Sequence, residues 1–172
     1  MSRKRCYTIV CILLCLSLLA GCRKGKEPEE GESFICYVNT EDTALVKEKY
    51  EMKGENAEEK VQNLLNAMQK EPDSIEYKSV FPEKLKIQDW TLSDKKLEIH
   101  FNSTYEKLSA AKEVLLKAAV VQTLSQLSEV EYVCFFIENS PLTDNLGKEV
   151  GYMRAEDFVQ NTGSLLYSYQ VG

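Results

Sequence analysis

The sequence is poor in the residues from which metal sites and hydrolytic centres are usually built. Its 172 residues include a single histidine, His100. A structural zinc site needs four ligands at close spacing, and a catalytic triad needs a base within hydrogen-bond reach of its nucleophile. His100 falls in an alternating strand pattern, on the side expected to face solvent. No glycine-rich phosphate loop occurs either. We therefore expect no catalytic residues, no metal and no cofactor.

Glycine, proline and basic residues are also in short supply. Eight glycines and four prolines exclude collagen-like and low-complexity chains. The 21 basic residues are outnumbered by 27 acidic ones, giving a formal net charge of -6. Binding to nucleic acid depends on clustered lysine and arginine, and no such cluster appears after residue 26. The sequence therefore predicts one acidic domain of ordinary size that does not bind nucleic acid.

The one long apolar run is too short to cross a membrane. Arg3, Lys4 and Arg5 precede an uncharged stretch at residues 7–19, whereas a spanning helix needs about 20 residues. A basic start followed by a short apolar stretch is typical of a secretory signal peptide. The next residues, Leu19-Ala20-Gly21-Cys22, resemble the lipobox of bacterial lipoproteins.

The lipobox resemblance implies a defined processing of the N-terminus. A diacylglyceryl group is joined to the cysteine by a thioether, the chain is cut before it, and the new amino terminus is usually acylated. We therefore predict a signal peptide at residues 1–21 and lipidation of Cys22. The alternative is an uncleaved transmembrane anchor. Lipidation would attach the chain to the membrane at its extracytoplasmic face.

Residues 22–33 follow as a charged tether without a large apolar residue. Removal of residues 1–21 takes away three basic residues and no acidic one, so the mature chain has 18 basic and 27 acidic residues, a net charge of -9. As a flexible coil, ten residues span about 18 Å, which would keep the folded part near the bilayer.

Two cysteines remain beyond the tether, Cys36 and Cys134. They can form a disulfide only if they lie on neighbouring strands and face the same side. Both are flanked by bulky apolar residues, which favours the alternative of two small buried hydrophobic side chains.

Hydrophobic periodicity divides the rest of the chain into alternating elements. Asn56 with Glu59 forms an N-cap pair for a helix that ends before Pro72. A second helix runs from about Ser109 to Ser128 and has a wide apolar face. Strands are predicted at 34–38, 45–52, 85–92, 97–101 and 130–137, the second at a sheet edge and the next two as a hairpin. This order predicts an α+β fold in which two helices pack on one face of a mixed sheet.

Several of these segments together resemble the GerM (GerMN) domain of lipoproteins from spore-forming Firmicutes. The strongest likeness is at residues 121–127 followed by 130–133, and further likeness covers Asn39 and residues 61–68, 79–82, 97–101, 141–144, 147, 150–153 and 158. The chain departs from the family at three places. The family often has an acidic residue in place of His100, a glycine in the turn 93–96, and a glycine in place of Asn139. The predicted domain extends from residue 34 to 160.

The resemblance implies a noncatalytic extracytoplasmic module related to ring-building domains of sporulation and secretion complexes. We expect this protein to assist assembly of an envelope complex in sporulation or spore germination, and a homo-oligomer is compatible with that role. The alternative is a lipoprotein that binds cell-wall glycan or a small ligand.

The C-terminal tail at 161–172 carries three candidate interaction residues, Leu166, Tyr167 and Tyr169. Aromatic side chains are favoured at the centres of interfaces. The alternative is that the tail packs on its own domain or frays. Trp90, in the first arm of the hairpin, is interpreted as part of the core.

Overall fold

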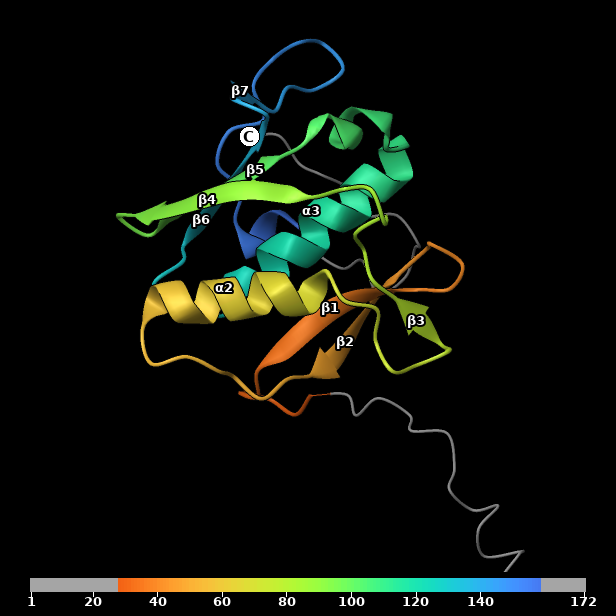
Figure 1. The fold of residues 1–172 in the computed structure, drawn as a ribbon, viewed down its shortest axis with the longest axis vertical. Coiled ribbons are helices and arrows are strands. Elements are labelled where there is room, and N and C mark those ends of the chain that lie inside the picture. The colour runs from red at the N-terminus through yellow and green to blue at the C-terminus, as the bar shows by residue number, and fades with distance from the viewer. Residues whose placement is uncertain (1–27, 159–172) are drawn as a thin grey trace, which may run out of the picture.

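The computed structural model describes residues 28–158. The predicted signal peptide, Cys22, and the tail residues Leu166, Tyr167 and Tyr169 lie outside this range. In chain order the elements are β1 (Phe34–Asn39), β2 (Leu45–Lys49), α2 (Ala57–Met68), β3 (Tyr77–Lys78), β4 (Ile87–Ser93), β5 (Lys96–Phe101), η1 (Ser103–Lys107), α3 (Ala110–Leu124), β6 (Tyr132–Ile137), β7 (Ser140–Pro141) and η2 (Ala155–Asp157) (Figure 1).

The strands form two sheets. One is antiparallel with the order β2-β1-β3, and the other has the order β4-β5-β6-β7, in which β5 and β6 run parallel and the other pairs are antiparallel. The predicted α+β class with two helices is confirmed, and the edge position of β2 is confirmed as well. The strands are divided between two sheets, however, where the sequence predicted one.

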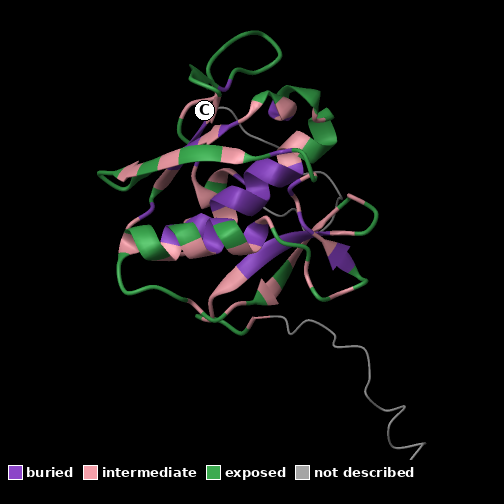
Figure 2. Ribbon diagram, viewed as in Figure 1, coloured by how far each residue is buried: buried purple, intermediate pink, exposed green. Residues whose placement is uncertain are grey.

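Helix α3 explains why the two sheets remain separate. Nine of its 15 residues are buried, from Leu115 to Leu124 with the exception of Gln122. It packs against both β1 and β6, so that the helix lies between the sheets instead of covering one face of a single sheet (Figures 1 and 2). A helix segment that is apolar on most of its sides is buried among other elements, as the second half of α3 is.

Side chains of α3 and the residues after it also occupy one edge of β1. The Cys36 N–H donates to Thr123 Oγ1 at 3.0 Å. Gln126 binds both backbone groups of Phe34, because its Oε1 accepts from the N–H at 3.0 Å and its Nε2 donates to the carbonyl at 2.7 Å. These groups would otherwise pair with another strand. The edge of β1 is therefore satisfied without joining the second sheet.

Both helices begin where the sequence predicted, and a side chain caps each of them. Asn56 Oδ1 accepts the N–H of Glu59 at 2.9 Å, and Ser109 Oγ accepts the N–H of Lys112 at 3.4 Å. Both helices end earlier than predicted, at Met68 and Leu124. Tight turns and short elements fill the remaining residues, including β3, η1 and η2, which the periodicity did not indicate.

The two hairpin turns in which the chain departs from the family pattern contain residues in the left-handed conformation. Asp94 and Lys95 have φ values of 49° and 63°, in the turn where the family often has glycine. Glu138, next to Asn139, has φ of 55° in the turn between β6 and β7. Residues other than glycine rarely adopt this left-handed backbone conformation. The Glu138 turn lies beside the candidate site.

Candidate functional site

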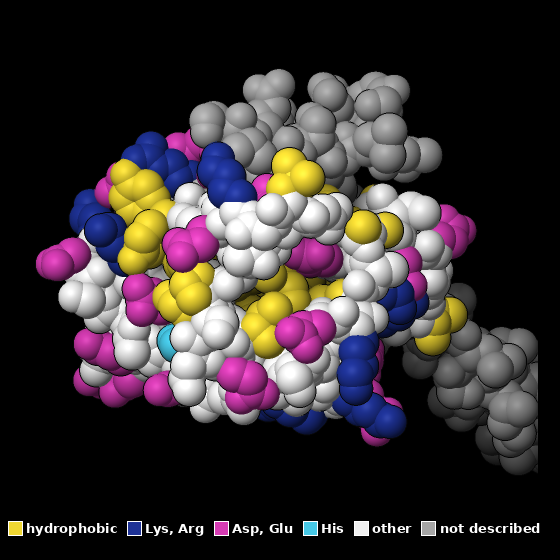
Figure 3. Space-filling model, turned by 90° about the horizontal axis from the view of Figure 1, so that it is seen from above, with side chains coloured by type: hydrophobic (Ala, Val, Ile, Leu, Met, Phe, Trp, Pro, Cys, Tyr) yellow, Lys and Arg dark blue, Asp and Glu magenta, His cyan; other side chains and the backbone are white. Residues whose placement is uncertain are grey.

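A groove of about 500 Å³ opens at the end of the molecule formed by η1 and β7. Its floor and walls include buried Tyr105 and Leu142, half-buried Leu108 and Ile137, and exposed Pro141. Three carboxylates line it as well, those of Glu106, Glu113 and Glu138, and the remaining lining residues are Ser103, Ser140 and Thr143. We call this hollow the acidic groove. Figure 3 looks down on this end of the molecule, where hydrophobic and acidic side chains lie side by side.

Glu138 fixes one side of the acidic groove. Its carboxylate accepts from the Ser103 N–H at 3.0 Å and from Gln88 Nε2 at 3.1 Å. Its backbone N–H donates to the Phe101 carbonyl at 2.7 Å, and its carbonyl lies 2.8 Å from His100 Nδ1. Strained backbone persists only where the surroundings hold it, and such positions cluster at functional sites. Four contacts hold Glu138 in its left-handed conformation.

Glu113, on the first turns of α3, forms the opposite wall. It accepts from Lys117 Nζ at 3.1 Å and from the Tyr105 hydroxyl at 3.5 Å. Burial, and next the charge of Glu113, raise the pKa of Tyr105 well above its usual value, so that the phenol stays protonated and donates. Glu106 is exposed at the rim, on η1.

A second hollow of about 570 Å³ lies between α2 and the sheet of β1 and β2. It is lined by Tyr37 and Tyr50, by the amides of Asn63 and Asn66, and by lysines and carboxylates in equal number. Burial raises the pKa of Tyr37 to about 12. This hollow is polar and carries no excess of charge.

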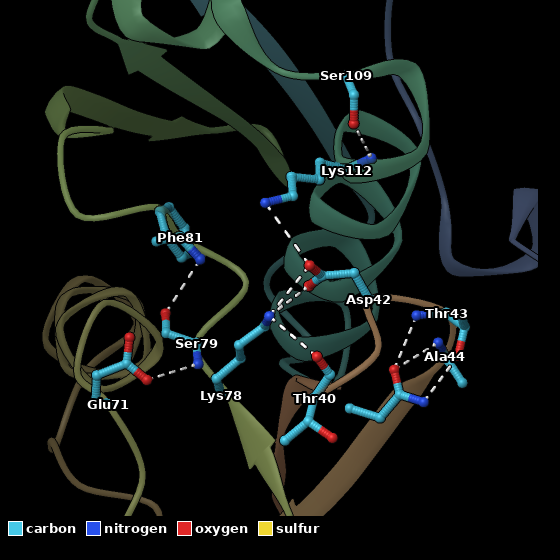
Figure 4. Close-up of polar contacts among 11 residues, drawn as sticks. Thr40, Asp42, Thr43, Ala44, Glu71, Lys78, Ser79, Phe81, Ser109 and Lys112 are labelled. Carbon is cyan, nitrogen blue, oxygen red and sulfur yellow. Dashed lines mark hydrogen bonds and ion pairs between the residues drawn. The ribbon is translucent and has the colours of Figure 1, made fainter.

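A third hollow, of about 170 Å³, has Asp42 in its lining. Lys78 Nζ lies 3.1 Å from the Asp42 carboxylate and 3.3 Å from the Thr40 carbonyl, and Lys112 Nζ lies 3.7 Å from Asp42 (Figure 4). These contacts join the β1–β2 turn to β3 and to the start of α3. Because both lysines already form ion pairs with Asp42, we interpret this cluster as structural.

The residues singled out for chemistry are placed as follows. His100 lies on the outer face of β5, where its ring stacks on Phe136 with centroids 4.6 Å apart, and is half-buried rather than fully solvated.

Cys36 and Cys134 are both free and buried, in different sheets, which confirms their interpretation as buried hydrophobic residues. Burial raises the pKa of each thiol to about 11. Trp90 is half-buried and packs against the core, and its Nε1 donates to Gln62.

The sequence did not indicate the acidic groove. Glu106 and Glu113 are close together in the chain, but Glu138 is not, and acidic residues are common throughout. One signal was available, namely the departure from glycine at Asn139, because Asn139 lies in the turn in which Glu138 is held. Among residues 28–158, no group of three histidine, cysteine or acidic residues is arranged to hold a metal ion. Within the same residues, no helix is long and apolar enough to cross a membrane.

Comparison with known families identifies the family of the domain. The Germane family, described as "Sporulation and spore germination", matches residues 34–143. The protein belongs to the Germane family. Every residue that lines the acidic groove falls within the matched part of this Germane domain. The resemblance to the GerM domain is thereby confirmed.

Two solved structures have a similar fold. The Germane domain is similar to the tandem GerMN domains of the sporulation protein GerM from Bacillus subtilis, with a TM-score of 0.57 and 12% identity, covering 73% of this chain and 46% of that one. The first GerMN domain of the same protein gives a TM-score of 0.58 and 13% identity, with 73% and 98% covered. The chain thus spans about half of the tandem structure. At this identity the likeness shows the fold. No curated protein sequence matches the chain.

Proposed function

We propose that this protein is a membrane-anchored extracytoplasmic lipoprotein whose Germane domain is a noncatalytic interaction module. In this proposal it assists assembly of an envelope complex during sporulation or spore germination. The observation that carries the proposal is the Germane match over residues 34–143, in a family described by sporulation and germination.

The environment of the reactive side chains supports a noncatalytic role. His100 is engaged by the Glu138 carbonyl and by the ring of Phe136. Both thiols are buried and, with pKa values of about 11, are protonated at neutral pH, whereas the thiolate is the nucleophile. These groups are placed for packing and positioning.

The anchoring part of the proposal is tested by cell fractionation. Substitution Cys22→Ala should move the protein from the membrane fraction to the soluble or secreted fraction, because two or three acyl chains provide stable attachment. The matched control is Cys134→Ala, which also removes one thiol and should leave the protein on the membrane. Mass analysis of the natural N-terminus should find a lipid-modified residue 22. An uncut, unmodified N-terminus would contradict the anchor.

The assembly part is tested in sporulating cells of the source organism. Crosslinking followed by mass spectrometry should recover envelope proteins attached to the Germane domain. Deletion of the gene should impair sporulation or germination. Capture of no envelope protein, together with normal spores, would refute the proposed role.

The hollow beside α2 favours a second candidate function, the binding of cell-wall glycan. Tyrosine rings and the amides of Asn63 and Asn66 are groups that can contact sugar faces and hydroxyls, and a volume of about 570 Å³ is large enough for a small ligand. A pull-down with purified peptidoglycan separates the two functions. Retention that is lost in Asn66→Leu and preserved in Glu106→Lys would favour the glycan.

A further inference from the structure

The acidic groove combines an apolar floor with charge of a single sign. Its lining includes five apolar or aromatic side chains and three carboxylates, and no lysine or arginine. The other two hollows are lined by both signs of charge. Even though Lys117 pairs with Glu113, the groove as seen from solvent presents acidic groups around an apolar surface.

Lysine and arginine side chains match this combination. Each has an apolar stem that can lie on a hydrophobic surface while its charged end reaches a polar rim. Burial of each methylene contributes about 0.8 kcal/mol, and complementary charge favours the correct partner over others. We propose that the acidic groove binds a basic segment of a partner protein, with lysine or arginine stems on the floor and their charges against Glu106, Glu113 and Glu138. This proposal rests on the proposed interaction function and adds the chemistry of the partner.

Recognition here would depend on side chains and not on strand addition. The strand beside the groove, β7, has only two residues, and one of them is Pro141. Proline lacks an N–H and blunts the edge of a sheet. A partner strand would thus find little backbone to pair with at this edge.

The basic segment that follows Cys22 in a second copy is a poor match for the groove. Arg23, Lys24 and Lys26 directly follow Cys22, and the predicted lipid would hold them at the membrane surface. The chain enters the domain beside β1 and β2, whereas η1 and β7 lie at the other end (Figure 1). The groove therefore lies at the end of the domain away from the point where the chain enters it.

A binding measurement with defined peptides tests the proposal on the whole chain. The probe is a fluorescent, acetylated hexamer of lysine, followed by anisotropy at low ionic strength. Glu106→Lys should weaken binding about tenfold, because reversal of one rim charge replaces an attraction by a repulsion. The matched control is Glu51→Lys, which makes the same change of net charge at an exposed position between β2 and α2. It should change affinity by less than about twofold.

A second peptide tests the apolar floor. A hexamer of 2,4-diaminobutyrate carries the same charge on stems that are shorter by two methylenes, and it should bind at least about tenfold more weakly. Equal binding of the two peptides, an equal loss in Glu51→Lys, or no binding of the lysine hexamer would overturn the proposal. Because Glu106 is exposed, its substitution should leave the fold intact. An unchanged melting temperature of Glu106→Lys would show this.

The same variant separates this proposal from the one on which it rests. In sporulating cells, loss of the crosslinked envelope partner in Glu106→Lys and its retention in Glu51→Lys would support the groove as the binding site. Retention in both variants would refute the groove while the assembly function stands. Absence of any partner from the unsubstituted protein would refute the assembly function itself.

Discussion

Substitution of Thr123 tests how β1 is held apart from the second sheet. Thr123 is fully buried, and its hydroxyl accepts the N–H of Cys36, which is fully buried too. Thr123→Val keeps the shape of the side chain and removes the acceptor. The Cys36 N–H would then lie in the interior without a partner.

The expected loss of stability follows from that orphaned group. A buried backbone donor without an acceptor costs about 1–3 kcal/mol, which is a substantial part of the roughly 5–15 kcal/mol that stabilises a domain. With a urea dependence of about 1–3 kcal/mol per molar, the unfolding midpoint should fall by about 1 M. Thr91→Val, on the exposed side of β4, makes the same chemical change without a buried partner and should shift stability by less than about 0.5 kcal/mol.

Hydrogen exchange gives an independent reading of the same contact. In Thr123→Val the Cys36 amide should exchange faster relative to the global unfolding limit, whereas Thr123→Ser should preserve its protection because the hydroxyl remains. An unchanged midpoint and an unchanged Cys36 amide in Thr123→Val would refute the reasoning that α3 takes the place of a strand.

Three further predictions concern other contacts. Gln126→Leu removes both partners of the Phe34 backbone and should lower the free energy of unfolding by about 1–2 kcal/mol in urea titrations, with equal stability counting against the contact. Lys95→Gly should raise stability by about 0.5–1 kcal/mol, because it relieves the left-handed φ in the β4–β5 turn; a lower melting temperature would contradict this. Burial raises the pKa of Cys36 from 9.0 to about 11. The contribution of this thiol to the free energy of unfolding is therefore complete below pH 9, and about 2–3 kcal/mol of it is lost as the pH rises toward 11. Cys36→Ala should show a shallower alkaline decline, and an identical decline would argue against the buried thiol as its cause.

Local chemistry explains why much of the fold was predictable. The pair of Asn56 and Glu59 set the start of α2, and strict alternation set the buried face of β5. The almost continuously apolar run at 130–137 indicated a strand, and β6 does lie inside a sheet, between β5 and β7. Each of these signals depends on residues that are close together in the chain, so it can be identified from the sequence alone.

Pairing between distant segments was not predictable in the same way. The periodicity of α3 indicated a wide apolar face, but only its position between two sheets shows why nearly every residue from 115 onward is buried. The acidic groove is a similar case. Glu106, Glu113 and Glu138 meet because η1, α3 and the β6–β7 turn are brought to one end of the domain.

The amino-acid sequence by itself determined the five longer strands, the helix starts, the acidic charge and the family resemblance, because propensity, capping and alternation depend on near neighbours. The tertiary structure alone decided that the strands divide into two sheets around α3, since Thr123 and Gln126 satisfy backbone groups some 90 residues away. It also decided which of many acidic residues surround an apolar hollow. Charge can be counted along a chain, whereas a binding surface exists only where folding brings separated side chains together.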